Sequence, residues 1–319
     1  MSVEVPTQPG AEVERTETAS DKGAKAPISE RERHERRLGL LLAGPAFALM
    51  LIVTFYPVLN SIWLSFNRYT LASPDDREFV GLSNYVTVLT SLLWWNDMFT
   101  TVLLTVFTVA AELVIGFIFA MVMHRAIFGR KTVRVAILVP YGIVTVVSAF
   151  AWQFAFDPTA GFVNSLFGTD KNFFGDRWSS LFVIFLAELW KTTPFISLLL
   201  LAGLATVPSV LGEAAEVDGA TAWQRLWRVT IPNMKAAILV AVLFRTLDAF
   251  RIFDTVFVMT RGANDTETLS FLSYNQMINR LNIGLGSAVS VLLFVCVVLI
   301  AVLFVKGFKT DIGAARGER

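Results

Sequence analysis

Cysteine, histidine and charged residues are all scarce in this sequence. The single cysteine, Cys296, excludes a disulfide bond within the chain. The two histidines, His34 and His124, each lie among arginines beside an apolar run, which is not a metal-ligand pattern. Only 17% of the residues are charged and the net charge is +1, so no overall field attracts nucleic acid or acidic substrates.

Catalytic motifs are also lacking. No G-x-x-x-x-G-K-[ST] phosphate-binding loop occurs, so we expect this chain neither to bind nor to hydrolyse ATP. No nucleophile–base pair stands out in the linear sequence, although such groups can converge from distant positions. The sequence therefore does not predict an enzyme.

Long apolar runs dominate what is present. Hydrophobic residues make up 55% of the chain, with 27 phenylalanines. A bilayer core about 30 Å thick needs about 20 apolar residues per helix, so these runs predict an all-α integral membrane protein. The six predicted transmembrane helices are 38–66, 98–123, 135–156, 179–205, 234–260 and 286–308.

The regions outside the spans predict how the chain is oriented. Residues 1–36 are too polar to offset their ordering entropy and are expected to form a disordered cytosolic tail, with a second tail at 309–319. Basic residues favour the cytosolic side of a membrane. Both termini are therefore predicted to be cytosolic, because the side that they share carries eighteen Lys and Arg residues and the opposite side six.

A polar segment, 208–232, separates the fourth and fifth predicted spans and lies on the predicted cytosolic side. Ser209 is a plausible N-cap for a helix ending near Val217, and Asp218-Gly219 favours a tight turn. A second helix is predicted over 221–229, ending before Pro232. Alone, this pattern fits either a protein-docking element or an amphipathic loop whose tryptophans rest on lipid headgroups.

Ionisable residues also occur inside the predicted spans. Arg245, Asp248, Arg251 and Asp254 recur every three residues, which predicts a stripe of alternating charge along the fifth span. Such groups normally face a bundle interior or a wet cavity. The stripe fits an ion-pair ladder between spans or, in part, direct substrate binding. Glu188 and Lys191 are expected to pair with each other or with the stripe, and Glu112 to bridge to another span.

Several motifs resemble those of a transporter family. Glu213-Ala214-Ala215, Asp218-Gly219-Ala220 and Ile231-Pro232, where Leu-Pro is usual, resemble the EAA motif of bacterial ABC importer permeases. VGLSNY, ILVPYGIV, LWKTTPF, RTLDAFRIFD and GLGSAVSV are similar to stretches of maltose and glycerol-phosphate permeases. The resemblance implies a six-span type I importer permease at 37–308 and an ATPase-docking segment at 208–232. The implied docking residues are Glu213, Ala214, Ala215, Asp218, Gly219, Ala220, Arg225 and Pro232.

The resemblance also implies partners and a substrate. They are a second permease subunit, two copies of an ATP-binding subunit that hold ATP and Mg²⁺, an extracytoplasmic sugar-binding lipoprotein, and a disaccharide, for which trehalose is the expected identity. Aromatic rings, hydroxyls and amides suit a sugar. The predicted substrate-pathway residues are Tyr141, Trp152, Gln153, Glu188, Trp190, Lys191, Thr192, Phe195, Asp248 and Arg251. An ion-coupled secondary carrier and a membrane-embedded enzyme acting on lipid or glycan remain the competing hypotheses.

Overall fold

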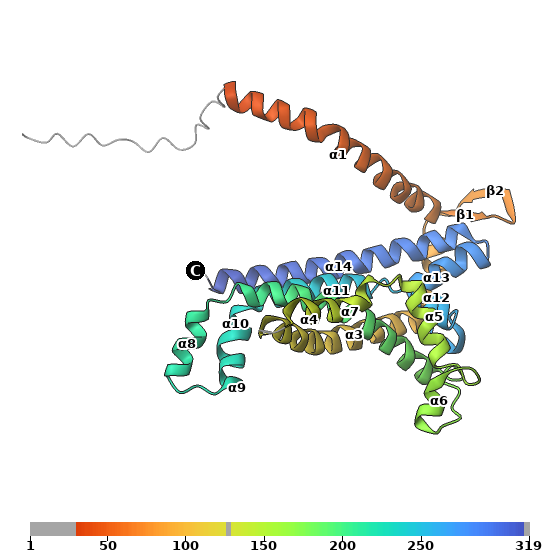
Figure 1. The fold of residues 1–319 in the computed structure, drawn as a ribbon. Helices are drawn as coiled ribbons and strands as arrows, with labels where there is room; N and C mark the ends of the chain where they lie inside the picture. The colour runs from red at the N-terminus through yellow and green to blue at the C-terminus, as the bar shows by residue number, and fades with distance from the viewer. Residues whose placement is uncertain (1–29, 126–128, 316–319) are drawn as a thin grey trace, which may run out of the picture. The chain divides into compact units, whose positions relative to one another are not determined.

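A computed structural model describes residues 30–125 and 129–315 of the chain (Figure 1). Residues 1–29 and 316–319 of the two predicted tails therefore lie outside the described residues. Residues 30–36 are helical, so the prediction of disorder was wrong for this part of the first tail, and residues 309–315 continue a helix. The chain divides into two units, residues 1–56 and 57–319. The first helix, α1 (Glu30–Ser65), crosses the boundary between them. It begins before the predicted span at 38, and its membrane-compatible part is Leu41–Ser65.

Four helices in the described ranges are long and apolar enough to cross a membrane, or five if one bent pair is counted as a single span. They are α1, α3 (Leu92–Arg125), α7 (Arg177–Ala205) and α14 (Ile283–Ala315). The bent pair is α4 (Arg130–Gly142) with α5 (Thr145–Ala155), which meet at 90°. The prediction of six spans stays a prediction.

The predicted span 234–260 is not one continuous helix. Its two parts are α11 (Lys235–Ala249) and the short α12 (Asp254–Met259). Between them the backbone tightens, because the Ile252 N–H donates to the Ala249 carbonyl, three residues back. The Ile252 carbonyl then accepts a hydrogen bond from Thr268 Oγ1 at 3.0 Å, which satisfies a backbone group that the break would otherwise leave unpaired.

Helices α3, α7 and α11 pack closely against one another and form the centre of the second unit. A Cβ atom at Gly116 of α3 would lie 2.7 Å from the Ile196 side chain of α7. A Cβ atom at Gly203 of α7 would lie 2.5 Å from Ala237 of α11. Small residues thus let these helices approach, as is typical of helix packing in membranes.

The predicted loops contain secondary structure that the sequence analysis missed. Residues 67–97 form an antiparallel hairpin, then α2 (Ser83–Thr90), and then the start of α3 at Leu92 rather than at 98. The hairpin strands are β1 (Asn67–Thr70) and β2 (Ser73–Phe79). The later loops contain α6 (Phe162–Phe167), a 3₁₀ turn η2 (Ala263–Asp265), α13 (Leu269–Tyr274) and a π-helical turn η3 (Asn275–Asn279).

The VGLSNY stretch, residues 80–85, forms hydrogen bonds with the end of α1. The buried Asn84 amide donates to the carbonyls of Ser65 at 2.8 Å and Asn67 at 2.9 Å. The Tyr85 hydroxyl lies 2.6 Å from Ser65 Oγ. Gly284, at the start of α14, lies directly against the Asn67 carbonyl. This motif therefore joins α1, β1 and α14.

Gly284→Ala should destabilise the protein by about 1–3 kcal/mol, because its Cβ would lie 2.2 Å from the Asn67 carbonyl oxygen and force the backbone to move. The measurement is the thermal unfolding midpoint of the purified transporter complex. Gly307→Ala is the matched control on the same helix, since nothing lies within 4 Å of its added methyl group. Equal midpoints for the two variants would contradict the assigned contact.

Candidate functional site

A cavity of about 460 Å³ gathers six of the ten predicted substrate-pathway residues. Its walls come from the α4–α5 bend, α7, α11, the break after α11, and α12. The six are Tyr141, Glu188, Lys191, Thr192, Asp248 and Arg251, and the other lining residues are Thr145, Arg245, Ile252, Phe253, Asp254 and Thr255.

The four remaining predicted residues lie outside this cavity lining. Trp152 and Trp190 line a separate, mostly apolar pocket of about 480 Å³, with their ring centroids 6.2 Å apart. Gln153 Nε2 donates to the Met259 carbonyl at 3.2 Å and so joins α5 to α12. Phe195 stacks on Tyr141 at 5.7 Å and supports the cavity wall from behind.

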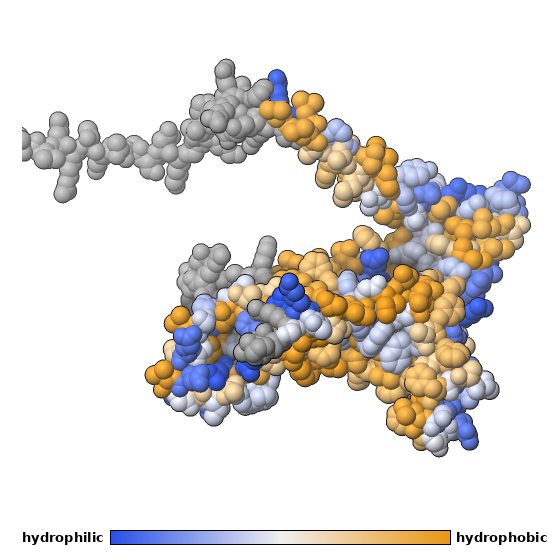
Figure 2. Space-filling model, viewed as in Figure 1, coloured by the Kyte–Doolittle hydropathy of each residue, from blue (hydrophilic) through white to orange (hydrophobic). Residues whose placement is uncertain are grey.

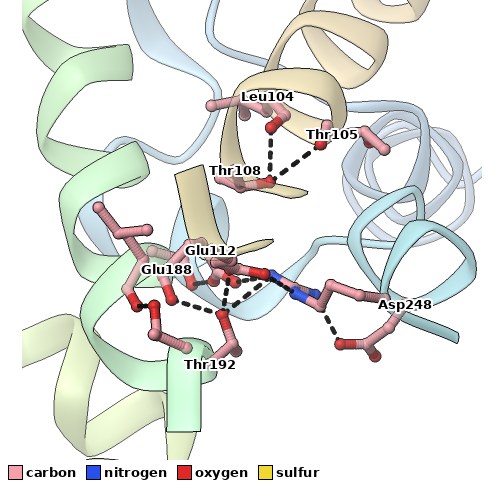
Figure 3. Close-up of polar contacts among 11 residues, drawn as sticks. Leu104, Thr105, Thr108, Glu112, Glu188, Thr192 and Asp248 are labelled. Atoms are coloured by element: carbon pink, nitrogen blue, oxygen red, sulfur yellow. Dashed lines mark hydrogen bonds and ion pairs between the residues drawn. The ribbon is translucent and has the colours of Figure 1, made fainter. Parts of the chain in front are cut away.

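Arg245 is the centre of a largely buried ionic cluster in the cavity wall. Figure 3 shows its partners Glu112, Glu188, Thr192 and Asp248 close together. Its Nε and Nη2 atoms donate to the Glu112 carboxylate of α3 at 2.6 and 3.0 Å. Nη1 donates to Asp248 at 2.7 Å, and Nη2 lies 3.4 Å from Glu188 of α7. Thr192 accepts from Nη2 at 3.1 Å. One guanidinium therefore connects α3, α7 and α11.

The contacts in this cluster test two predictions from the sequence, the bridging role of Glu112 and the stripe of four charges. Glu112 bridges to another span, as expected, because its carboxylate bonds Arg245 of α11. The predicted stripe of four charges is interrupted, since α11 ends at Ala249 and leaves Arg251 and Asp254 beyond it. Periodicity alone could not reveal this end, because it depends on the distant Thr268.

Lys191 does not pair with Glu188. The Glu188 carboxylate accepts from Arg245 and from the Thr255 hydroxyl instead. Lys191 Nζ lies 5.7 Å from the Tyr141 ring centroid, a cation–π arrangement. Its side chain is buried, and within the described ranges it has no carboxylate partner at ion-pair distance. Lys191 therefore lines the cavity, and no hydrogen bond to its ammonium group occurs among the described residues.

The segment 208–232 forms two helical arms joined by a tight turn (Figure 1). The first arm, α8 (Ser209–Val217), ends at the predicted residue, and the turn follows with Gly219 at φ +79°. Ser209 is the first helical residue rather than the N-cap, a position held by Pro208. At the second arm, Thr221 and Gln224 form a reciprocal capping box.

The second arm continues past its predicted end. It consists of α9 (Ala222–Arg225), a π-helical turn η1 (Leu226–Thr230) and α10 (Ile231–Asn233). The prediction that it ends before Pro232 was wrong, because proline sits in the first turn of α10, where its missing N–H costs little. The arms are tied together by an ion pair between Arg225 and Glu216.

The predicted docking residues are mostly accessible. Glu213, Ala214, Asp218, Gly219 and Pro232 are exposed, whereas Ala215, Ala220 and Arg225 are half-buried. Large apolar side chains are exposed beside them: Val210, Val217, Trp223 and Trp227. Figure 2 shows hydrophilic and hydrophobic side chains together over these arms, in contrast to the more uniformly hydrophobic surface of the neighbouring helices. An exposed surface of this mixed character suits contact with another protein.

A buried polar face on α3 escaped the sequence analysis. It carries Asp97, Thr101, Thr105, Thr108 and Glu112, at spacings of three and four residues. Asp97 precedes the predicted span 98–123, yet it lies within α3, where it is fully buried and its carboxylate oxygens have no partner among the described residues. The helical spacing of these polar residues is the signal that could have revealed this face.

Glu267, in the loop after α12, should make the stability of the protein depend on pH. Burial raises the pKa of its carboxyl above the ordinary value, opposed by a hydrogen bond from Asn275 and by Arg280. A raised acid pKa stabilises the fold at low pH, and this contribution is lost as the pH rises through the folded-state pKa. The unfolding midpoint of the wild type should therefore fall as the pH rises above 4.5, and Glu267→Gln should make this fall smaller. An unchanged pH profile would contradict this assignment.

Comparison with known proteins identifies the family. The family described as "Binding-protein-dependent transport system inner membrane component" matches residues 112–310. The trehalose transport system permease protein SugA of Mycobacterium tuberculosis (strain ATCC 25618 / H37Rv) is 50% identical over 274 residues, covering 86% of this chain and 89% of SugA. The trehalose/maltose permease MalF of Thermococcus litoralis is 36% identical, covering 87% of this chain and 96% of MalF.

A solved structure supports the fold. A chain of a bacterial ABC transporter involved in the import of the acidic polysaccharide alginate aligns with a TM-score of 0.75 at 20% identity, over 91% of this chain and 100% of that chain. The mainly helical importer-permease fold predicted from the sequence is thereby confirmed. The family also favours an ATP-driven importer over an ion-coupled secondary carrier. This chain belongs to the binding-protein-dependent transport system inner membrane components, which are the non-catalytic, multi-pass permease subunits of ABC importers.

Proposed function

We propose that this chain is a permease subunit of a trehalose importer. The observation that carries the proposal is the 50% identity to the trehalose permease SugA over most of both chains. The complete transporter would contain a second permease subunit, two copies of an ATP-binding subunit that hold ATP and Mg²⁺, and an extracytoplasmic sugar-binding lipoprotein.

The 460 Å³ cavity is the proposed sugar site on this subunit. Its volume lies within the range of about 300–1,000 Å³ that is usual for small-molecule sites. The acidic lining residues Glu188, Asp248 and Asp254 balance the basic residues Lys191, Arg245 and Arg251. A lining without net charge suits a neutral disaccharide, and the exposed part of the Tyr141 side chain offers aromatic surface and a hydroxyl group for contact with a sugar.

The segment 208–232 is the proposed contact with the ATP-binding subunit. Its two arms are joined by the turn at Gly219 and by the Arg225–Glu216 pair, so a push on one arm would move both. Closure of the ATP-binding subunits would shift this segment toward the helices that carry the cavity. The two permeases would then alternate between outward-open and inward-open states.

The proposed topology places both termini and segment 208–232 in the cytosol, with six spans in the permease domain. The loops 67–97, 157–178 and 261–285 then face outward. We infer that these loops receive the loaded binding protein, since they are the parts of the chain on its side of the membrane.

Uptake of radiolabelled trehalose by a strain that lacks this permease tests the substrate. Expression of the chain should restore uptake, and excess unlabelled trehalose should compete more strongly than maltose, whereas glycerol phosphate should not compete. Stronger competition by maltose or glycerol phosphate would contradict the assignment to trehalose. The empty vector and an unrelated permease are the controls.

A further inference from the structure

Glu188 and Lys191 lie three residues apart on α7 and line the same cavity. Opposite charges at this spacing are neighbours on a helix surface and favour an ion pair. The structure shows a different arrangement, in which Glu188 is bonded by Arg245 and Thr255. Other contacts must therefore keep the Glu188 carboxylate from pairing with the adjacent Lys191 ammonium group.

The geometry of Arg245 explains how the carboxylate is withheld. A guanidinium carries five N–H donors in a rigid plane and can serve several acceptors at once. Here it is almost fully buried, and it bonds Glu112 and Asp248 while Nη2 also reaches Glu188 at 3.4 Å. Thr255 holds the other oxygen of the Glu188 carboxylate. Both carboxylate oxygens thus have partners other than Lys191.

We propose that Arg245 is a positioning residue for substrate binding: by holding Glu188, it keeps the Lys191 ammonium free to donate hydrogen bonds to a sugar in the cavity. This inference rests on the proposed function, in which the cavity receives the sugar. Arg245 needs no contact with the sugar, because it acts through Glu188 and Lys191.

Replacing the Arg245 guanidinium by a lysine ammonium group should release Glu188. A lysine at position 245 keeps one positive charge for Glu112 but lacks the planar set of donors that also reaches Glu188. The released Glu188 would pair with Lys191 and occupy its donors. Loss of a hydrogen bond from a charged group corresponds to about a tenfold weakening of binding or more.

The test measures binding of radiolabelled trehalose to the purified complete transporter, without nucleotide or binding protein. Arg245→Lys and Lys191→Met should each weaken binding about tenfold or more. The double variant R245K/K191M should bind no more weakly than K191M alone, because both changes remove the same donor. R245K/E188Q should regain most of the affinity, since glutamine cannot neutralise Lys191.

The following results of the binding experiment would contradict the inference. Losses that multiply in R245K/K191M would show that Arg245 acts independently of Lys191. A failure of E188Q to rescue R245K would show that the released carboxylate is not the cause, and an equal loss in E188Q alone would place Glu188 itself on the sugar. Assembly of each complex is checked by size-exclusion chromatography.

A second variant addresses the case in which R245K does not assemble. Thr255→Val is nearly isosteric and frees the other Glu188 oxygen, so it should weaken binding by a smaller factor and be rescued by E188Q in the same way. Absence of that rescue would overturn the inference. If the wild-type complex binds no trehalose, the proposed function fails, whereas normal wild-type binding with no rescue in either pair contradicts this inference alone.

Discussion

Gly219→Pro should abolish ATP-driven uptake while the chain still reaches the membrane. Gly219 has φ +79°, whereas proline fixes φ near −65°. Proline also lacks the N–H that Gly219 donates to the Glu216 carbonyl at 3.0 Å. A misplaced proline costs about 3 kcal/mol or more, which corresponds to about a 100-fold loss of the native turn. The measurement is ATP-dependent sugar uptake by reconstituted complexes.

Gly219→Asn is the matched control for this change. Asparagine tolerates positive φ and keeps the backbone N–H, so its uptake should stay close to that of the wild type. Copurification of the ATP-binding subunit with each variant separates failed docking from failed transport. Normal assembly together with normal uptake in Gly219→Pro would contradict the docking role proposed for the turn.

Arg245→Met should destabilise the permease by about 3–5 kcal/mol, because it leaves buried carboxylates without their cation. Glu112 is fully buried and bonded through two guanidinium nitrogens, and Glu188 is nearly as buried. The expected result is a large fall in the unfolding midpoint and in the yield of assembled complex. Detergent-resistant complex measured across a temperature series gives the midpoint.

Neutralising the partner should reverse part of this loss. Arg245→Met/Glu112→Gln removes one of the two uncompensated buried charges, so the double variant should be more stable than Arg245→Met alone. Arg68→Met is the matched control, because the Arg68–Glu78 pair is exposed and such pairs contribute about 0–1 kcal/mol. Equal midpoints for Arg245→Met and Arg68→Met would contradict the buried cluster.

Features set by local sequence were predictable. The bounds of α8 and the turn at Gly219 follow from a proline start, a helical stretch and a glycine break, all within about ten residues. The predicted fourth span, 179–205, differs from α7 only by two residues at its start. The bridging role of Glu112 was also predictable, because an isolated carboxylate in an apolar helix needs a partner from another element.

Features that depend on distant contacts could not be predicted from the sequence. Residues 250–253 contain neither glycine nor proline to mark a break, and the Ile252 carbonyl at the break is bonded by Thr268 from a later loop. The choice of Glu188 between Lys191 and Arg245 depends on how α7 packs against α11. Six of the predicted pathway residues share one cavity, whereas Trp152 and Trp190 line another pocket, because helical spacing does not say which neighbouring helix a side chain meets.

The most direct test of the account is trehalose uptake by proteoliposomes that contain the complete transporter, with the binding protein outside and ATP inside. We predict that uptake continues when ionophores dissipate every ion gradient and stops when the partner ATP-binding subunits are made catalytically inactive. Uptake that ionophores abolish, and that persists with inactive ATP-binding subunits, would contradict an ATP-driven permease coupled through residues 208–232.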